Sequence, residues 1–151
     1  MKEAEFQAYL STIRKEDWQQ LFALLEVIEK AKDFGKLHGM KAGDGGQLYA
    51  PYWESSEVVR RFFNIVYEMH IVFSFNWMDW EQGKGILRNN AQNYELLDSL
   101  ALCKLITTIV RADRFNDGYL NLCFEEGIVE KILVSLKRNV ENASLKAESE
   151  G

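Results

Sequence analysis

The sequence predicts a mostly α-helical fold, a single helical domain with a small β-hairpin or long-loop insertion. Apolar residues recur every three or four positions over most of the chain, which is the period of a helix with one buried face. A stretch at 34–53 that contains several glycines interrupts this pattern, and a single proline leaves little scope for rigid linkers. We expect one domain over residues 1–141 and a polar tail over residues 142–151 that frays.

Two helices are expected before the insertion. The first buries one face at helical spacing, made of Phe6, Tyr9, Leu10 and Ile13. Asp17 is expected to cap the second helix, with Gln20 three residues on, and that helix should end before Gly35. Its predicted buried stripe is Trp18, Leu21, Phe22, Leu25 and Ile28.

The insertion at 34–53 contains a turn at 41–46 and favours a β-hairpin or a long ordered loop. Its glycines invite comparison with a phosphate-binding loop. No Gly-Lys-Ser/Thr follows and no apolar strand precedes, so turn chemistry explains them better. His38 is expected to be an exposed loop residue.

Ser55 or Ser56 is expected to cap the next helix. Its buried arc is predicted to contain Val58, Phe62, Ile65, Val66, Met69, Val72 and Phe73. Arg60, Arg61, Asn64 and Glu68 are predicted to face water. His70, at the edge of the arc, is interpreted as a core or boundary residue rather than a catalytic base.

An aromatic segment at 73–80 leads into residues 81–88, where two glycines favour a connector with one helical turn. Trp77 and Trp80, with two nearby phenylalanines, could form a pocket that stacks a planar ligand, with Asp79 as an acceptor. A hydrophobic plug over one end of the helical bundle is the favoured alternative. If both tryptophans are exposed on one patch, a partner surface explains them better.

Residues 94–115 are predicted to form the central helix, because apolar residues cover nearly its whole circumference. The exception is a polar stripe of Lys104, Thr107, Thr108 and Arg111 on one side. Two further helical segments should follow, divided by Gly127.

The end of the central helix carries four charges within seven residues, Arg111, Asp113, Arg114 and Asp117. Helical geometry makes the two arginines neighbours. They could hold an anionic ligand between them, or they could pair internally with Asp113, Asp117, Asp79 or Glu125. Asp117 could instead cap the following segment. The internal ion-pair lock is favoured, because it explains both signs of charge without a ligand.

Composition excludes several functions. A net charge of −5 disfavours nucleic acid and membrane surfaces and suits a basic protein partner. Two histidines cannot build a multi-histidine zinc site, and we predict no metal and no cofactor. Cys103 and Cys123 are interpreted as buried, reduced thiols in a cytosolic protein. No catalytic motif is encoded locally, which favours a non-enzyme without excluding acid-base chemistry by converging carboxylates.

The segments 102–120 and 124–127, with the motif Arg-Ala-Asp-Arg-Phe-Asn-Asp-Gly, resemble a bacterial family of domains of unknown function, as does 75–83 with its Phe-x-Trp-x-x-Trp motif. The likeness extends from the second helix to about residue 137. It implies a shared structural or binding feature built from Lys104, Arg111, Asp113, Arg114, Asp117 and Trp80, but no activity. Asn76 stands where the family pattern has Asp, which argues against a role that needs a carboxylate there.

The leading functional prediction is a cytosolic, non-catalytic protein-interaction factor of a regulatory or immunity type, which binds a protein partner or a second copy of itself. The alternative is a protein or enzyme that binds a small anionic ligand. In that alternative Arg111 and Arg114 form the clamp, Lys104 lies nearby, Trp77 and Trp80 form a wall, and Asp113 or Asp117 is the acid-base group.

Overall fold

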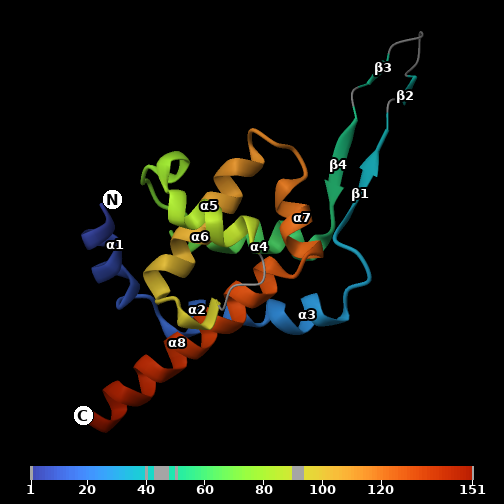
Figure 1. Cartoon of the computed structure of the whole chain (residues 1–151). Coiled ribbons are helices and arrows are strands. Elements are labelled where there is room, and N and C mark those ends of the chain that lie inside the picture. Colours follow the sequence, from blue (N-terminus) through green and yellow to red (C-terminus); the bar gives the residue numbers. More distant parts are fainter. Residues whose placement is uncertain (1, 40, 43–47, 50, 90–93, 151) are drawn as a thin grey trace.

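A computed structural model describes residues 2–39, 41–42, 48–49, 51–89 and 94–150 of the chain. It confirms the mostly helical fold with a small hairpin (Figure 1). The helices form a bundle, the hairpin projects from one end of it, and the last part of the C-terminal helix α8 projects at the opposite end.

The N-terminal part contains α1 (Glu3–Leu10), α2 (Lys15–Phe22) and α3 (Leu24–Lys30). The cap predicted at Asp17 is wrong, because α2 begins at Lys15 and Arg14 occupies the N-cap position, three residues before Asp17. Asp17 lies in the first turn instead, with an oxygen 3.5 Å from the guanidinium Nε of Arg14. The predicted second helix is also divided, at Ala23, although its second part does end before Gly35.

The insertion is a long antiparallel hairpin. Strand β1 (Gly35–His38) pairs with β4 (Tyr52–Ser55), and farther out β2 (Lys41–Ala42) pairs with β3 (Leu48–Tyr49). Residues 43–47, which include most of the predicted glycine turn, lie outside the described residues.

His38 is not the exposed loop residue that was predicted. It belongs to β1, where its Nε2 lies 2.7 Å from a carboxylate oxygen of Glu54 and its ring stacks on Tyr52. The hydrogen bond and the charge of His38 lower the pKa of the Glu54 carboxyl. Contacts across the two strands therefore partly cover His38, which the glycine-rich sequence around it had indicated to be a loop residue.

The base of the hairpin is fixed to helix α7 (Tyr119–Glu125) by the buried side chain of Asn121. Its amide donates to the carbonyl of Phe34 at 2.6 Å and accepts from the hydroxyl of Ser55 at 3.0 Å. Gly35 adjoins this amide, and a Cβ at that position would overlap it. Both ends of the hairpin are thereby attached to one residue of the bundle.

Helix α4 (Glu57–Glu68) follows with Ser56 at the predicted N-cap position. The Ser56 hydroxyl makes no cap bond and is buried without a hydrogen-bond partner among the described residues. The helix ends before the predicted arc does, because His70 adopts a left-handed conformation with φ 58°. His70 is exposed, so its prediction as a core or boundary residue is wrong. The chain then turns back into the core at Ile71 and Phe73.

After the short 3-10 turn η1 (Trp77–Asp79), residues 81–88 form a full α-helix, α5 (Glu81–Arg88). The prediction of a connector is wrong. Ile86 and Leu87 are buried, and the ring of Trp80 lies against Gly83. Packing against the bundle offsets the low helix propensity of the two glycines.

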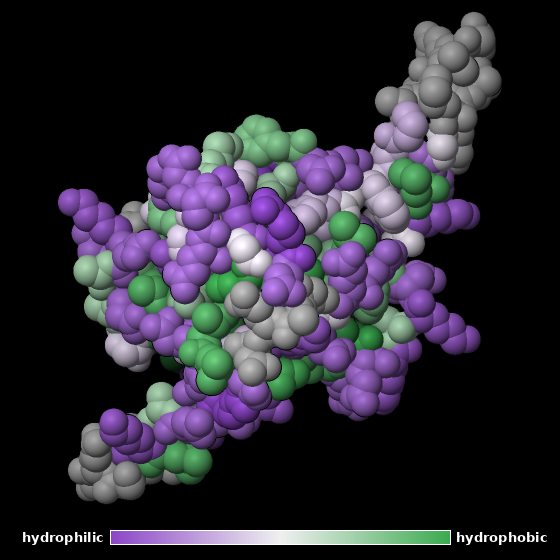
Figure 2. Space-filling view, viewed as in Figure 1, coloured by the Kyte–Doolittle hydropathy of each residue, from purple (hydrophilic) through white to green (hydrophobic). Residues whose placement is uncertain are grey.

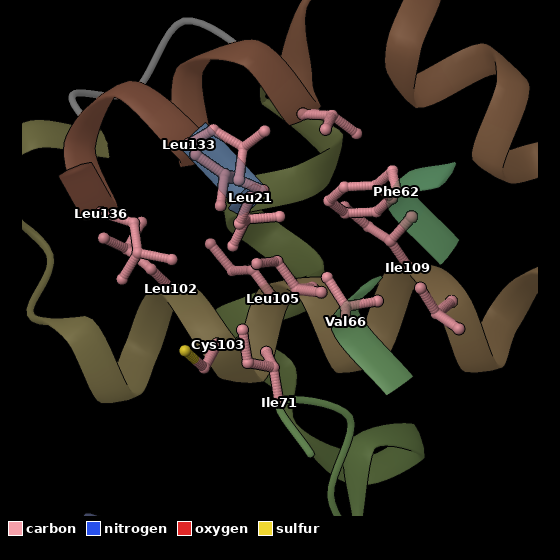
Figure 3. Close-up of a cluster of buried hydrophobic side chains, with 14 of the residues drawn as sticks. Leu21, Phe62, Val66, Ile71, Leu102, Cys103, Leu105, Ile109, Leu133 and Leu136 are labelled. Atoms are coloured by element: carbon pink, nitrogen blue, oxygen red, sulfur yellow. The ribbon is translucent and has the colours of Figure 1, made fainter. Parts of the chain in front are cut away.

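The central helix α6 (Ser99–Asp113) is buried on nearly all sides, as predicted, but it begins later. Asp98 caps it by accepting from the Ala101 amide at 2.8 Å, and the separate turn η2 (Tyr94–Leu96) leaves Leu96 81% exposed. In Figure 3, side chains of α2, α4 and α8 converge on those of α6. Among the labelled residues are Leu21, Phe62, Leu105, Ile109 and Leu133.

The polar stripe of α6 is largely covered by the chain that follows α4. Thr107 is fully buried, and its hydroxyl oxygen lies 3.1 Å from the Ile71 carbonyl and 2.9 Å from the Cys103 carbonyl. The same oxygen lies 3.4 Å from the amide nitrogen of Phe73. Thr108 is also buried, and in the part of the chain that the structure describes its hydroxyl bonds to the Lys104 carbonyl of its own helix. These two threonines therefore serve packing.

Helix α7 and the last helix, α8 (Ile128–Glu150), are divided at Gly127 as predicted. The helix continues to Glu150 through the segment that was expected to fray, and fraying of this end stays a prediction. Within the described ranges, none of the helices combines the length and apolar character required to cross a membrane.

Candidate functional site

The charged motif forms the corner between α6 and α7, residues 111–118, called the α6–α7 corner below. Its two carboxylates are engaged by backbone amides. Asp113 accepts from the Leu120 amide at 2.9 Å, which caps α7, and an oxygen of Asp117 lies 3.4 Å from the Trp53 amide nitrogen on the hairpin. Gly118, with φ +90°, lies against the indole of Trp53. The two carboxylates therefore fix the backbone at the start of α7 and in the hairpin.

The two arginines of the corner gather around Tyr67 of α4. The guanidinium carbon of Arg111 lies 5.8 Å from the centre of the Tyr67 ring, and Nη2 of Arg114 lies 3.4 Å from its hydroxyl oxygen. Over the described ranges, no carboxylate oxygen lies within 4.0 Å of a nitrogen of either side chain. The favoured prediction of an internal ion-pair lock is therefore wrong, because the acids bind backbone instead.

A third arginine lies on the same side of α4. Arg60, Phe63, Asn64 and Tyr67 follow one another at three- and four-residue spacing, so they share one helix face. The first three, with Asp113, line a cavity of about 180 Å³. One nitrogen of Arg60 donates to the Ser55 carbonyl at 2.6 Å, and it too lacks a carboxylate within 4.0 Å in the described part of the chain.

The site is cationic on an acidic protein. At the cavity, the guanidinium of Arg60 is opposed by the carboxylate of Asp113, which also accepts from a backbone amide. Arg111 and Arg114 add two guanidinium groups at the corner itself, where Asp117 adds one carboxylate. The chain as a whole carries −5. An excess of unpaired guanidinium favours a partner or ligand that brings negative charge.

Apolar side chains border the arginines. Trp77 lies with its ring centre 6.2 Å from that of Phe115, which directly follows Arg114 and is 74% exposed. Met78, beside Trp77, is 49% exposed. Aromatic rings and arginine are enriched in the energetic centres of protein interfaces, and here the exposed ring is that of Phe115.

Trp80 and Lys104 belong to a different environment. The Lys104 ammonium lies 4.4 Å from the centre of the Trp80 ring, 5.1 Å from that of Phe75 and 2.9 Å from a carboxylate oxygen of Glu3 in α1. Phe75 in turn stacks on Phe73. The Lys104 side chain is only 13% exposed, so it stabilises the packing of α1 rather than completing the anion clamp.

The aromatic segment of residues 73–80 packs largely against the bundle, as expected for the hydrophobic plug that the sequence favours. Phe73 stacks on Phe6 of α1 with ring centres 3.9 Å apart, and Trp80 meets Phe75 edge to face. Asp79 accepts from the Asn76 amide at 2.7 Å. Asparagine at position 76 thus supplies a donor that an ionised Asp could not. Only Trp77 of the predicted aromatic wall reaches the corner.

Both cysteines are buried and free, as predicted. Burial raises the pKa of the Cys123 thiol to about 12 and that of Cys103 well above its ordinary value. Neither thiol is therefore a nucleophile at neutral pH. In the described part of the chain, His, Cys, Asp and Glu side chains form no group of three or more that could hold a metal ion.

The sequence interpretation missed Tyr67 and the contribution of Arg60, Phe63 and Asn64. Arg60 and Asn64 were assigned to water, and they are exposed. The available signal was their shared spacing with Tyr67 along α4. The spacing could not show that this face of α4 adjoins the α6–α7 corner, because Arg114 follows Tyr67 by 47 residues in the sequence.

Fold and site together define a mostly helical protein that presents, at one corner, the exposed ring of Phe115 beside two arginines that have no carboxylate partner among the described residues. The chain belongs to the family of unknown function DUF6508, which it matches over residues 13–142. No curated protein and no solved structure matches it.

Proposed function

We propose that this protein is a non-catalytic interaction domain whose α6–α7 corner binds an acidic surface of a partner protein. The observation that carries the proposal is that Arg111 and Arg114 have no carboxylate within 4.0 Å among the described residues. An arginine left free in this way can form bidentate hydrogen bonds with a carboxylate from outside.

The neighbouring apolar side chains support a protein rather than a simple ion as the occupant. Phe115, which directly follows Arg114, and Met78, which follows the Trp77 whose ring lies near that of Phe115, both offer exposed apolar surface. A partner that covers these side chains would gain from their burial and would also exclude water from the charged pairs. The inaccessible thiols fit a reducing cytosol, and we extend the proposal to a regulatory or immunity-type role in a bacterial cell.

The test compares capture of partners by matched variants. Immobilised wild-type protein and the variants Arg114→Ala and Phe115→Ser are exposed to native lysate, and retained proteins are quantified by mass spectrometry. Arg61→Ala is the control, since Arg61 is an exposed arginine of α4 that does not line the cavity. We expect a protein that the wild type and Arg61→Ala retain and both corner variants lose, with binding that weakens as salt rises. If no protein follows this pattern, the proposal fails.

A second candidate, binding of a small anion, is favoured by the cavity of about 180 Å³ beside Arg60 and Asp113. This candidate predicts that inorganic phosphate raises the melting temperature of the wild type and of Arg61→Ala, but not of Arg60→Ala. If phosphate has no effect while partner capture depends on Arg114, the protein interaction is the better assignment.

A further inference from the structure

The exposed face of α8 carries an ordered stripe of four side chains. Val134, Lys137, Glu141 and Leu145 follow at intervals of three, four and four residues, and therefore lie on one face of the helix. Val134 is 50% and Leu145 63% exposed. This α8 stripe has an apolar residue at each end and a basic and an acidic residue between them.

The two charges of the stripe have no ion-pair partner among the described residues. Lys137 and Glu141 are four residues apart on the same helix, but they do not pair with each other. Lysine before glutamate is the less favourable order for such a pair within a helix. Both side chains are therefore available to a partner from outside.

The C-terminal half of α8 stands away from the bundle and leaves open space on both flanks. In Figure 1 this end of the helix projects beyond the other elements, and Figure 2 shows hydrophobic atoms on it among hydrophilic ones. On one flank, a groove of about 800 Å³ runs between α8 and the α2–α3 pair, with Phe22 and Leu25 among its lining residues. Lys137, Glu141 and Leu145 form part of its α8 wall.

We propose that this groove and the α8 stripe bind α8 of a second copy of the chain, in antiparallel orientation. When the stripes of two copies are aligned in opposite directions, an acidic residue of one copy lies opposite each basic residue of the other. An apolar residue likewise lies opposite each apolar one. Lys137 then faces Glu141 of the second copy, and Val134 faces its Leu145. Each contact occurs twice around a two-fold axis, which is the isologous arrangement of most homodimers.

Charge complementarity selects the second copy and its direction. A parallel arrangement in the same register would place like charges opposite each other, which costs binding energy. In the antiparallel arrangement, both unpaired charges of each copy are matched and both exposed apolar side chains are covered. The groove beside the stripe provides room for the incoming helix.

A charge exchange tests the arrangement directly. Glu141→Lys places only basic residues at the centre of the contact, and Lys137→Glu places only acidic ones. We expect sedimentation velocity to show a concentration-dependent dimer for the wild type, and dissociation constants weakened at least about tenfold for each variant alone. An equimolar mixture of the two variants should form a heterodimer, because every facing pair is then of opposite sign.

Leu145→Glu should also abolish the dimer, whereas Leu37→Glu, at an exposed leucine on the projecting hairpin, should leave it intact. Circular dichroism confirms that each variant is folded, and all the substituted side chains are exposed in the wild type. A wild type that stays monomeric at high micromolar concentration would overturn the inference. A dimer that survives Glu141→Lys and Leu145→Glu, or a mixture that stays monomeric, would do the same.

Discussion

The indole of Trp53 lies directly against the backbone of Gly118, so the hairpin and the α6–α7 corner are in contact. Gly118 also has φ +90°, a conformation that side chains with a Cβ rarely adopt. Two separate requirements, space and backbone conformation, therefore select glycine at this position.

We expect Gly118→Ala to destabilise the fold by about 2–4 kcal/mol, since backbone strain adds to an overlap with the indole ring. Gly127→Ala is the matched control: Gly127 has φ +78°, but a Cβ there would meet no described atom within 4 Å. Its cost should be about 1 kcal/mol. Urea denaturation measures both, and in a Trp53→Ala background the cost of Gly118→Ala should fall towards that of the control. Equal costs for the two alanine variants would contradict the role of Trp53.

Alanine substitution of the two glycines of α5 should change the free energy of unfolding in opposite directions. Gly85 is exposed and has open space around it, so Gly85→Ala should stabilise the protein by about 0.5–1 kcal/mol through helix propensity. Gly83 lies under the Trp80 ring, so Gly83→Ala should cost about 1–3 kcal/mol through overpacking. Thermal and urea unfolding of the two variants give the comparison. Stabilisation by both would show that Trp80 moves away freely.

The two buried threonines of α6 differ in what they bond. Thr107→Val removes the hydroxyl that bonds the Ile71 carbonyl outside the helix, and should cost about 1–3 kcal/mol. Thr108→Val removes only a bond to its own helix, so its cost should stay within about 0.5 kcal/mol. Equilibrium unfolding provides both values. Amide exchange at Phe73 should accelerate only in the Thr107 variant.

Stability should fall at alkaline pH. Burial raises the pKa of Cys123 to about 12, and it also raises the pKa values of Cys103 and Tyr119. An unfolded cysteine titrates near ~8.5, so above that pH the unfolded state loses protons that the folded state keeps. The free energy of unfolding should therefore keep its full value below about pH 8.5 and decline as the pH rises towards 12.

Urea titrations between pH 7 and pH 10 measure this decline. A Cys103→Ala, Cys123→Ala double variant serves as the reference, and the slope with pH is compared rather than the absolute stability, because the substitutions also remove packing. The slope should be shallower in the double variant. An identical slope would mean that the thiols do not contribute.

The helical elements could be predicted because their signal is local. Apolar spacing alone indicated α4, α6 and the start of α8, since each of these buries a continuous face against the others. The helix α5 could not be predicted in the same way. Its two glycines argue against a helix, and the contact of Trp80 with Gly83 that favours one is created by the fold.

The charged corner was located from the sequence, but its pairing was not. Nothing in the local pattern shows that Asp113 is used by the Leu120 amide, or that Asp117 faces the Trp53 amide on a distant hairpin. Tyr67, which the two arginines approach, lies on another helix. Hydrogen bonds between distant segments decide which charges remain free.

The helix α1 ends at Leu10, before the segment that matches the family, which begins at residue 13. Yet Phe6 is completely buried, and the Tyr9 hydroxyl donates to the Met69 carbonyl at 2.6 Å. A fragment trimmed to residues 13–142 would uncover Phe73 and leave Lys104 without Glu3. The packed unit of this chain therefore extends beyond the segment that matches the family, and expression boundaries should be drawn to include α1.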